Sequence, residues 1–137
     1  MVFDPCDKLI PDSYYKDIDA EKIAMMSLQH TGRYYDLTQR MKEIVHMDLS
    51  MVDISDFVVV YINPEISMFG TIHELIKSLA QRKPTLVVIE GGKKYAANWL
   101  FGIMDFNFMF DDFPHLYSFL NQMNDGVITG DLSRWVF

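Results

Sequence analysis

Two short apolar runs with one amphipathic stretch between them constrain the fold of this chain more than any other feature. The first run is "DFVVVYI" (56–62) and the second is "TLVVIE" (85–90). Continuous runs of β-branched and aromatic residues are typical of strands buried on both faces of a parallel sheet. Between the runs, apolar residues recur at helical spacing, at Ile72, Leu75, Ile76, Leu79 and Ala80. The pattern predicts a strand-helix-strand unit.

The rest of the chain continues this alternation. Helical patterns cover Ala20–Gln29, about Tyr35 to Val52, "AANWLFGIM" (96–104) and Phe113–Met123, while "FNFMF" (106–110) suits a short last strand and "VFDP" (2–5) the end of another. Alternating strands and helices predict an α/β fold. We expect an open parallel sheet flanked by helices in three layers, Rossmann-like or flavodoxin-like, and a single domain over residues 1–137.

Composition narrows the class of protein. A hydrophobic content of 50% in 137 residues is enough for one proper core. The net charge of −7 argues against a nonspecific nucleic-acid binder, whose phosphate contacts need a basic face. No apolar run approaches the roughly 20 residues of a membrane span, and the single Cys6 forms neither an internal disulfide nor a metal cluster. We therefore expect a soluble, cytoplasmic protein without metal or cofactor that acts on small molecules or proteins.

Glu74 is the first residue with two readings. In "TIHE" (71–74), Thr71 and Glu74 fit a capping box, in which each side chain accepts from the other residue's backbone amide. The same position near a helix N-terminus favours an ionised carboxylate, and the preceding Gly70 lets a ligand approach the backbone closely. The pattern therefore leaves open a helix cap and a carboxylate nucleophile.

Asp48 is the second such residue. It lies seven residues after Met41, on the apolar stripe of its predicted helix between Val45 and Val52. Because an unpaired buried charge is costly, an aspartate there is either a structural hydrogen-bond acceptor or a site acid.

The remaining candidates suit ordinary structural roles, with one exception. Asp53 and Asp56 are typical turn acceptors, the four histidines have no nucleophile at motif spacing, and Gly91-Gly92 reads as a strand-exit turn. The exception is the loop from Asn63 to Gly70, which follows a predicted strand. Ligands bind beyond the carboxyl ends of parallel strands, so this loop is placed for binding.

Three stretches together have a recognisable order. They are "HMDLSMVDISDFVVVYI", "SMFGTIHELIKSLAQRKPTLVVI" and "NWLFG". The chain resembles the nucleoside 2-deoxyribosyltransferase-like family, which includes deoxynucleotide N-glycosidases. The shared features are an Asp-Leu pair, an Asp that opens a buried strand, a Gly-x-x-x-Glu-Leu helix start and Lys-Pro before the next strand. The resemblance spans roughly Ile44 to Gly102.

The resemblance implies an enzyme that cleaves or transfers the N-glycosidic bond of a 2-deoxynucleoside or its monophosphate. Glu74 would be the nucleophile, Asp48 the residue that hydrogen-bonds or protonates the base, and Asn98 a residue that reaches a neighbouring subunit's site. The implied substrate-binding residues are Asp4, Asn63, Ser67, Gly70 and Thr71. A noncatalytic nucleotide-binding or protein-interaction module that keeps the fold remains the alternative.

Two further expectations concern assembly. The surplus of Phe and Met from Trp99 to Phe113, with the family's shared sites, predicts a homo-oligomer with Asn98 near the subunit boundary. The family's first strand and helix have no match ahead of "VFDPC". We therefore expect that "VFDP" pairs beside "DFVVVYI", that a neighbouring chain donates a strand, or that the natural product is longer.

Overall fold

The computed structural model describes residues 18–128, which form two compact units. A helical unit covers residues 18–54 and a sheet unit covers residues 55–128. The predicted strand end "VFDP" lies outside the described residues. Within the described part of the chain, no helix combines the length and the apolar character needed to cross a lipid bilayer.

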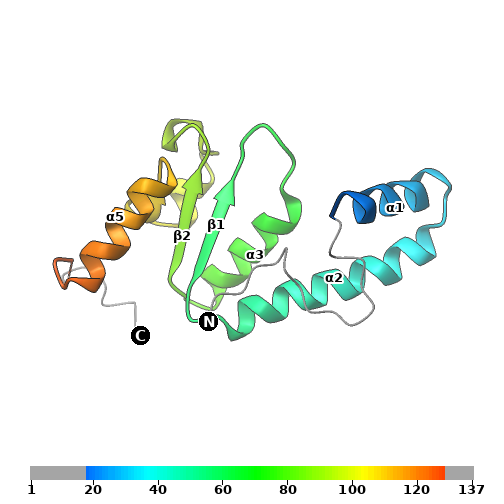
Figure 1. The fold of residues 1–137 in the computed structure, drawn as a ribbon, viewed down its shortest axis with the longest axis horizontal. Helices are drawn as coiled ribbons and strands as arrows, with labels where there is room; N and C mark the ends of the chain where they lie inside the picture. Colours follow the sequence, from blue (N-terminus) through cyan, green and yellow to red (C-terminus); the bar gives the residue numbers. More distant parts are fainter. Residues whose placement is uncertain (1–17, 129–137) are drawn as a thin grey trace. The chain divides into compact units, whose positions relative to one another are not determined.

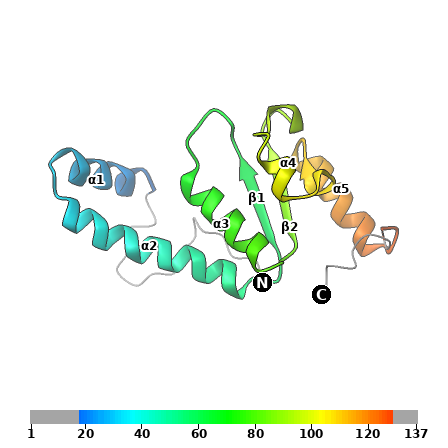
Figure 2. The same ribbon diagram turned by 180° about the vertical axis from the view of Figure 1, so that it is seen from behind.

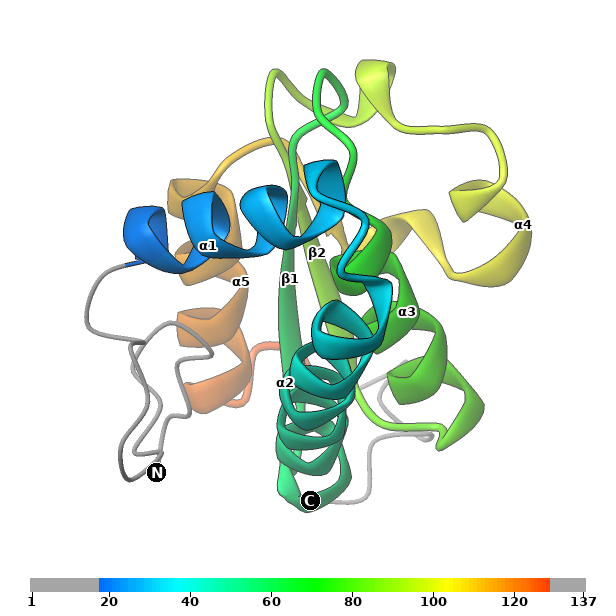
Figure 3. The same cartoon turned by 90° about the vertical axis from the view of Figure 1, so that its right-hand side faces the viewer.

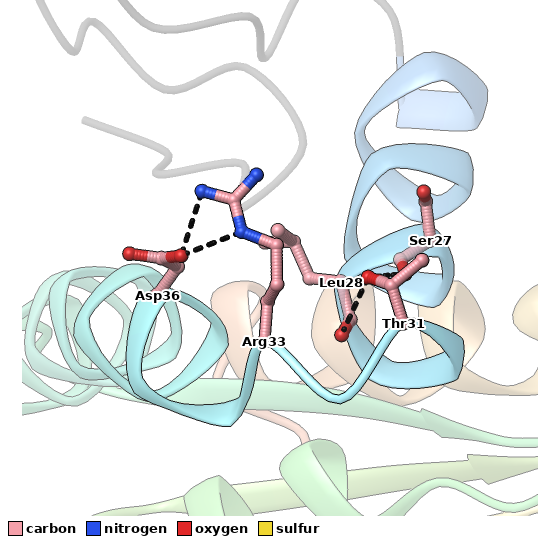
Figure 4. Close-up of polar contacts among 5 residues, drawn as sticks. All are labelled: Ser27, Leu28, Thr31, Arg33 and Asp36. Atoms are coloured by element: carbon pink, nitrogen blue, oxygen red, sulfur yellow. Dashed lines mark hydrogen bonds and ion pairs between the residues drawn. The ribbon is translucent and has the colours of Figure 1, made fainter.

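The helical unit consists of α1 (Ile18–His30) and α2 (Tyr34–Ile54), which confirms both predicted helices. Gly32 adopts φ +71°, and the amide of Arg33 donates to the Leu28 carbonyl at 2.9 Å, so α1 ends in a Schellman-type turn. The Thr31 hydroxyl donates to the Ser27 carbonyl at 2.7 Å (Figure 4). Arg33 then pairs with Asp36 in the first turn of α2. The break between the two helices, at Thr31 and Gly32, is thus a hydrogen-bonded turn.

An ion-paired network connects the two helices of this unit. The Arg40 guanidinium on α2 donates through Nε to Oε1 of Glu21 on α1 at 2.7 Å, and through Nη1 to Glu43 at 3.0 Å. Glu21 is buried. A buried carboxylate is costly unless it is paired, so this contact fixes how α1 lies on α2.

The sheet unit contains three parallel strands in the order β1-β2-β3, namely β1 (Val58–Ile62), β2 (Thr85–Ile89) and β3 (Met109–Phe110). Val60 pairs with Val87, and Val87 pairs with Met109. The arrows of β1 and β2 point to the same edge of the sheet (Figure 1). The predicted α/β class with an open parallel sheet is confirmed.

Helices cover the two faces of this sheet in three layers. The helices α3 (Phe69–Ala80) and α4 (Leu100–Ile103, labelled in Figure 2) contribute to one core cluster with the strands, through Leu75 and Leu100. On the other face, α5 (Phe113–Asn124) packs through Leu116 against Leu86 and Val88. Figure 3 shows α5 on one side of the strands and α3 and α4 on the other. Cover on both faces explains why β2 is a continuous apolar run that is buried at every residue.

The segment from 93 to 110 differs from the prediction. The expected helix over "AANWLFGIM" is only one turn, α4, preceded by a 3-10 turn, η1 (Lys93–Tyr95). The first three residues of "FNFMF" form η2 (Phe106–Phe108), because the Asp105 carboxylate accepts from the Asn107 amide at 2.8 Å. The last strand is therefore limited to two residues. Local side-chain capping overrides the β-propensity of the aromatic residues here.

β1 lies at an edge of the described sheet. Its residues Val58, Val60 and Ile62 face the α3 cluster, while Val59 and Tyr61 are 41% and 39% exposed. The α5 layer packs on β2 and β3. The α5 layer therefore leaves Val59 and Tyr61 of β1 partly uncovered on its face of the sheet.

Candidate active site

The candidate site is built around the start of α3, which follows the carboxyl end of β1. The helix begins at Phe69, and its N-cap residue, Met68, makes no side-chain capping hydrogen bond. The amide of Ile72 donates to the Met68 carbonyl at 2.9 Å. Thr71 is therefore inside the first turn instead of at the N-cap, and the predicted capping box with Glu74 is wrong.

Glu74 lies in the second turn of α3 and is partly buried. Thr71 lies one turn earlier on the same helix and is also partly buried. Leu75, the next residue after Glu74, has no exposed surface and anchors the helix on the sheet. The fold thus fixes the backbone of this carboxylate firmly, because its neighbour is part of the core.

Gly70, in the first turn of α3, has no structural requirement for glycine among the described residues. Its φ is not positive, and a Cβ added there would meet no atom within 4 Å. Glycine lowers helix stability by about 0.5–1 kcal/mol relative to alanine. The space beside the Gly70 backbone is open, as the close approach of a ligand requires.

The loop between β1 and α3 is held by Asn63. Its Oδ1 accepts from the Glu65 amide at 2.9 Å, and its own amide donates to the Met68 sulfur at 3.1 Å. Met68 also packs on the core cluster. Asn63 therefore shapes the loop, whereas Ser67 is exposed and makes no side-chain hydrogen bond with another residue in the range 18–128.

Asn98 lies between η1 and α4 and is exposed. Its flanking segment packs on the same core cluster as the start of α3, since Ala96 and Leu100 join Met68 and Ile72 there. The structure thus places the predicted binding segments of α3 and Asn98 on one face of the sheet. Large apolar side chains around them are exposed, namely Phe69, Tyr95, Trp99, Phe101, Ile103 and Phe106.

The two remaining predicted residues, Asp48 and Asp4, are not part of the described sheet unit. Asp48 is a partly buried residue of α2, in the helical unit, and the buried Val52 lies one turn further along. Met41 and Val45 on the predicted stripe are more exposed than expected. Asp4 lies outside the described residues.

A polar pair at the carboxyl edge of the sheet was not predicted from the sequence. The Tyr61 hydroxyl, near the end of β1, donates to the carboxylate of Glu90, which directly follows β2. This hydrogen bond raises the pKa of Tyr61 above its ordinary value, and desolvation and the negative charge of Glu90 add to the effect. The Tyr61 ring stacks on Phe113 of α5, with centroids 5.8 Å apart. The rule that ligands bind at carboxyl ends of strands draws attention to the position of Glu90 but does not predict its pairing with Tyr61.

Two further contacts at this edge were also missed. Oδ1 of Asp111, directly after β3, accepts from the amide of Lys93 at 2.7 Å. Asp112 caps α5: its Oδ1 accepts from the His115 amide at 2.8 Å and lies 2.5 Å from the His115 ring nitrogen Nδ1. The amide contact, and then the ring contact, lower the pKa of Asp112. The predicted strand-exit turn at Gly91-Gly92 is confirmed, with φ +77° and +100°.

Comparison of the chain with protein-family models, with curated proteins and with solved structures finds no match.

Proposed function

We propose that this protein cleaves or transfers the N-glycosidic bond of a 2-deoxynucleoside or a deoxynucleoside monophosphate, with Glu74 as the nucleophile. The observation that carries the proposal is the start of α3. A partly buried glutamate follows a glycine that neither backbone geometry nor packing requires, beside the carboxyl end of a parallel strand. The sequence resemblance supplies the reaction class.

The chemistry follows the logic of retaining glycosidases. A Glu74 oxygen attacks C1′ of the deoxyribose, the bond from C1′ to the base nitrogen breaks, and the departing base takes up a proton. Absence of the 2′-hydroxyl eases the oxocarbenium character of the sugar. A second base, or water, then attacks C1′ and releases the Glu74 carboxylate. The resemblance assigns to Asp48 the hydrogen bond or proton to the base, and it places Gly70 and Thr71 against the sugar or phosphate.

One observation favours the alternative of a protein-interaction module. Trp99 is 75% exposed and Phe69 is 86% exposed, beside further exposed aromatic side chains of the η1–α4 segment. Exposed apolar side chains gathered on one segment mark interaction surfaces. For the enzyme, the same surface suits a homo-oligomer with Asn98 at the subunit boundary. Light scattering that reports a monomer at micromolar concentration would remove this assembly and weaken Asn98 as a site residue.

The deciding experiment incubates the protein with the four deoxynucleosides and their monophosphates, with and without free bases, and separates the products by chromatography. We expect Glu74→Gln and Glu74→Ala to abolish turnover while circular dichroism stays native. Glu43→Gln is the matched control, because Glu43 is an exposed α2 residue whose ion pair with Arg40 contributes little to stability. A deoxyribosyl adduct trapped on the peptide that contains Glu74 would establish the nucleophile.

Undiminished turnover in Glu74→Gln eliminates the nucleophile assignment. For Asp48, we expect Asp48→Asn to slow departure of the base more than it weakens substrate binding. A pure loss of affinity with unchanged turnover contradicts the acid role. No turnover of any of these substrates by the unaltered protein leaves the interaction module as the better reading.

A further inference from the structure

We propose that an open cleft beside β3 binds a small, uncharged, polyhydroxylated molecule about the size of a monosaccharide. The cleft has a volume of about 250 Å³ and lies between η2, β3 and α5. Its lining includes no residue of α3 or of the loop before it. The inference is therefore independent of the role proposed for Glu74.

The floor of the cleft is apolar and rigid. It is formed by Met109 and Phe110 of β3, which are both buried, and by Phe119 of α5. The rings of Phe110 and Phe119 pack with their centroids 5.2 Å apart. Such a floor suits the C–H face of a small ring, because the apolar contact does not depend on the direction of any hydrogen bond.

The rim of the cleft is polar, with six side chains: Lys93, Asn107, Asp111, His115, Ser118 and Gln122. Contacts within the protein hold several of them. Asp111 is fixed by the amide of Lys93, and His115 by Oδ1 of Asp112. The Gln122 side-chain amide donates to the Ser118 hydroxyl oxygen at 3.2 Å. The rim is thus largely formed before a ligand arrives, which reduces the entropy lost on binding.

Several polar atoms of the rim remain for a ligand. The ammonium of Lys93, Nε2 of His115 and the side-chain amide of Asn107 make no hydrogen bond with another residue in the range 18–128. Because Ser118 accepts from Gln122, its hydroxyl hydrogen is available as a donor, and Oε1 of Gln122 is available as an acceptor. Both donors and acceptors are therefore present around one small opening.

The mixture of charges determines the class of ligand. An anion would meet the Asp111 carboxylate on the rim, and a cation would meet the ammonium of Lys93. A hydroxyl group both donates and accepts, so neighbouring hydroxyls match two carboxamides, one carboxylate, one ammonium and one serine. The volume is below the roughly 300–1,000 Å³ of pockets for drug-sized ligands, which limits the molecule to about one ring.

The test is a titration of the full-length, ¹⁵N-labelled protein with glucose, galactose, mannose and ribose, followed by amide chemical shifts. Inorganic phosphate and tetramethylammonium are the charged probes. We expect at least one sugar to shift amides between 107 and 122 in a saturable manner, and neither charged probe to do so. Gln122→Ala and Asn107→Ala should each weaken that binding about tenfold, the effect of losing roughly 1.4 kcal/mol of hydrogen bonding.

Asn121→Ala is the matched control, because Asn121 is an exposed carboxamide on α5 that does not line the cleft. It should leave the affinity unchanged. All three variants change exposed side chains, and their amide spectra report directly whether the fold is kept. Saturable binding of phosphate alone, binding that both variants leave intact, or no shift with any of the four sugars overturns the proposal.

Discussion

The hydroxyl oxygens of Ser78 on α3 and Thr85 at the start of β2 lie 2.7 Å apart in the core, where these residues are 0% and 4% exposed. Thr85 uses its single O–H to donate to the Lys83 carbonyl at 3.0 Å, so Ser78 is the donor to Thr85. This pair connects the helix to the strand that follows it.

Removal of the pair should lower stability in a graded way. Ser78→Ala deletes one buried hydrogen bond and should cost about 1 kcal/mol of unfolding free energy. Thr85→Val should cost more, because it also removes the donor to the Lys83 carbonyl. Urea unfolding measures both. Ser67→Ala, in the exposed loop, should stay within about 0.5 kcal/mol, and an equal loss in this control would contradict the buried contact.

Two adjacent residues of α3 should respond very differently to truncation. Leu75 has no exposed surface, whereas Ile76 is 48% exposed. Leu75→Ala removes core packing on β1 and β2 and should cost roughly 2–5 kcal/mol. Ile76→Ala should cost far less. Thermal or urea unfolding compares them, and equal effects would mean that α3 presents a different face to the sheet.

Gly70→Ala should separate stability from activity. The added methyl group meets no atom, so the variant should be more stable by about 0.4–1 kcal/mol through the unfolded chain. If a substrate approaches this backbone, the same methyl group should raise KM or abolish turnover in the nucleoside assay. A more stable variant with unaltered kinetics would remove Gly70 from the proposed site.

The hydrogen bond between Tyr61 and Glu90 should appear in the titration of the tyrosine. The pKa of Tyr61 is raised in the folded protein. The contribution of this hydrogen bond to stability is therefore complete below the unfolded pKa of 10.0 and is lost as pH rises through the folded pKa. Glu90→Gln should return the Tyr61 pKa toward its ordinary value. NMR of ¹³C-labelled tyrosine follows this directly, and Glu65→Gln should leave the titration unchanged.

The Asp112 cap should respond to pH in the opposite direction. The folded pKa of Asp112 is lowered, so its contribution to stability is present above the unfolded value of 3.8 and is lost as pH falls through the folded pKa. Asp112→Ala should lower the melting temperature of the protein at neutral pH. Asp112→Asn should retain most of the cap but weaken this acid dependence. An identical acid profile in all three proteins would contradict the assignment.

The elements best predicted from sequence are those with a strong period. The runs "VVVYI" and "TLVVI" are β1 and β2 within the expected bounds. The expected burial on both faces is found for β2, whereas β1 alternates between buried and exposed residues because it lies at the edge of the described sheet. The start of α3 was misplaced for a physical reason: Met68 is fixed by core packing and by the Asn63 amide, so no polar N-cap is needed. Sequence patterns for polar N-caps do not detect a helix start that is held by apolar packing.

The candidate site was predicted less completely than the fold. Glu74 was singled out from its position in the sequence, and its role and those of Gly70 and Thr71 were implied by the family resemblance; all three lie in the first two turns of α3. Glu90 and Asp111 were missed because their contacts join residues 29 and 18 positions apart in the chain. Local pattern carries no information on such pairs until the strand order is known.

The unequal lengths of the strands imply an order of opening within the sheet unit. β2 is buried at every residue and pairs along all five positions with β1, whereas β3 is joined to β2 by two residue pairs. Backbone amides exchange slowest where many contacts must break together. Protection of backbone amides from hydrogen exchange should therefore last longest in β2 and its partners β1 and α3. We expect β3 and α5 to open first, as a separate cooperative unit, and the cleft between them to be lost in that open state.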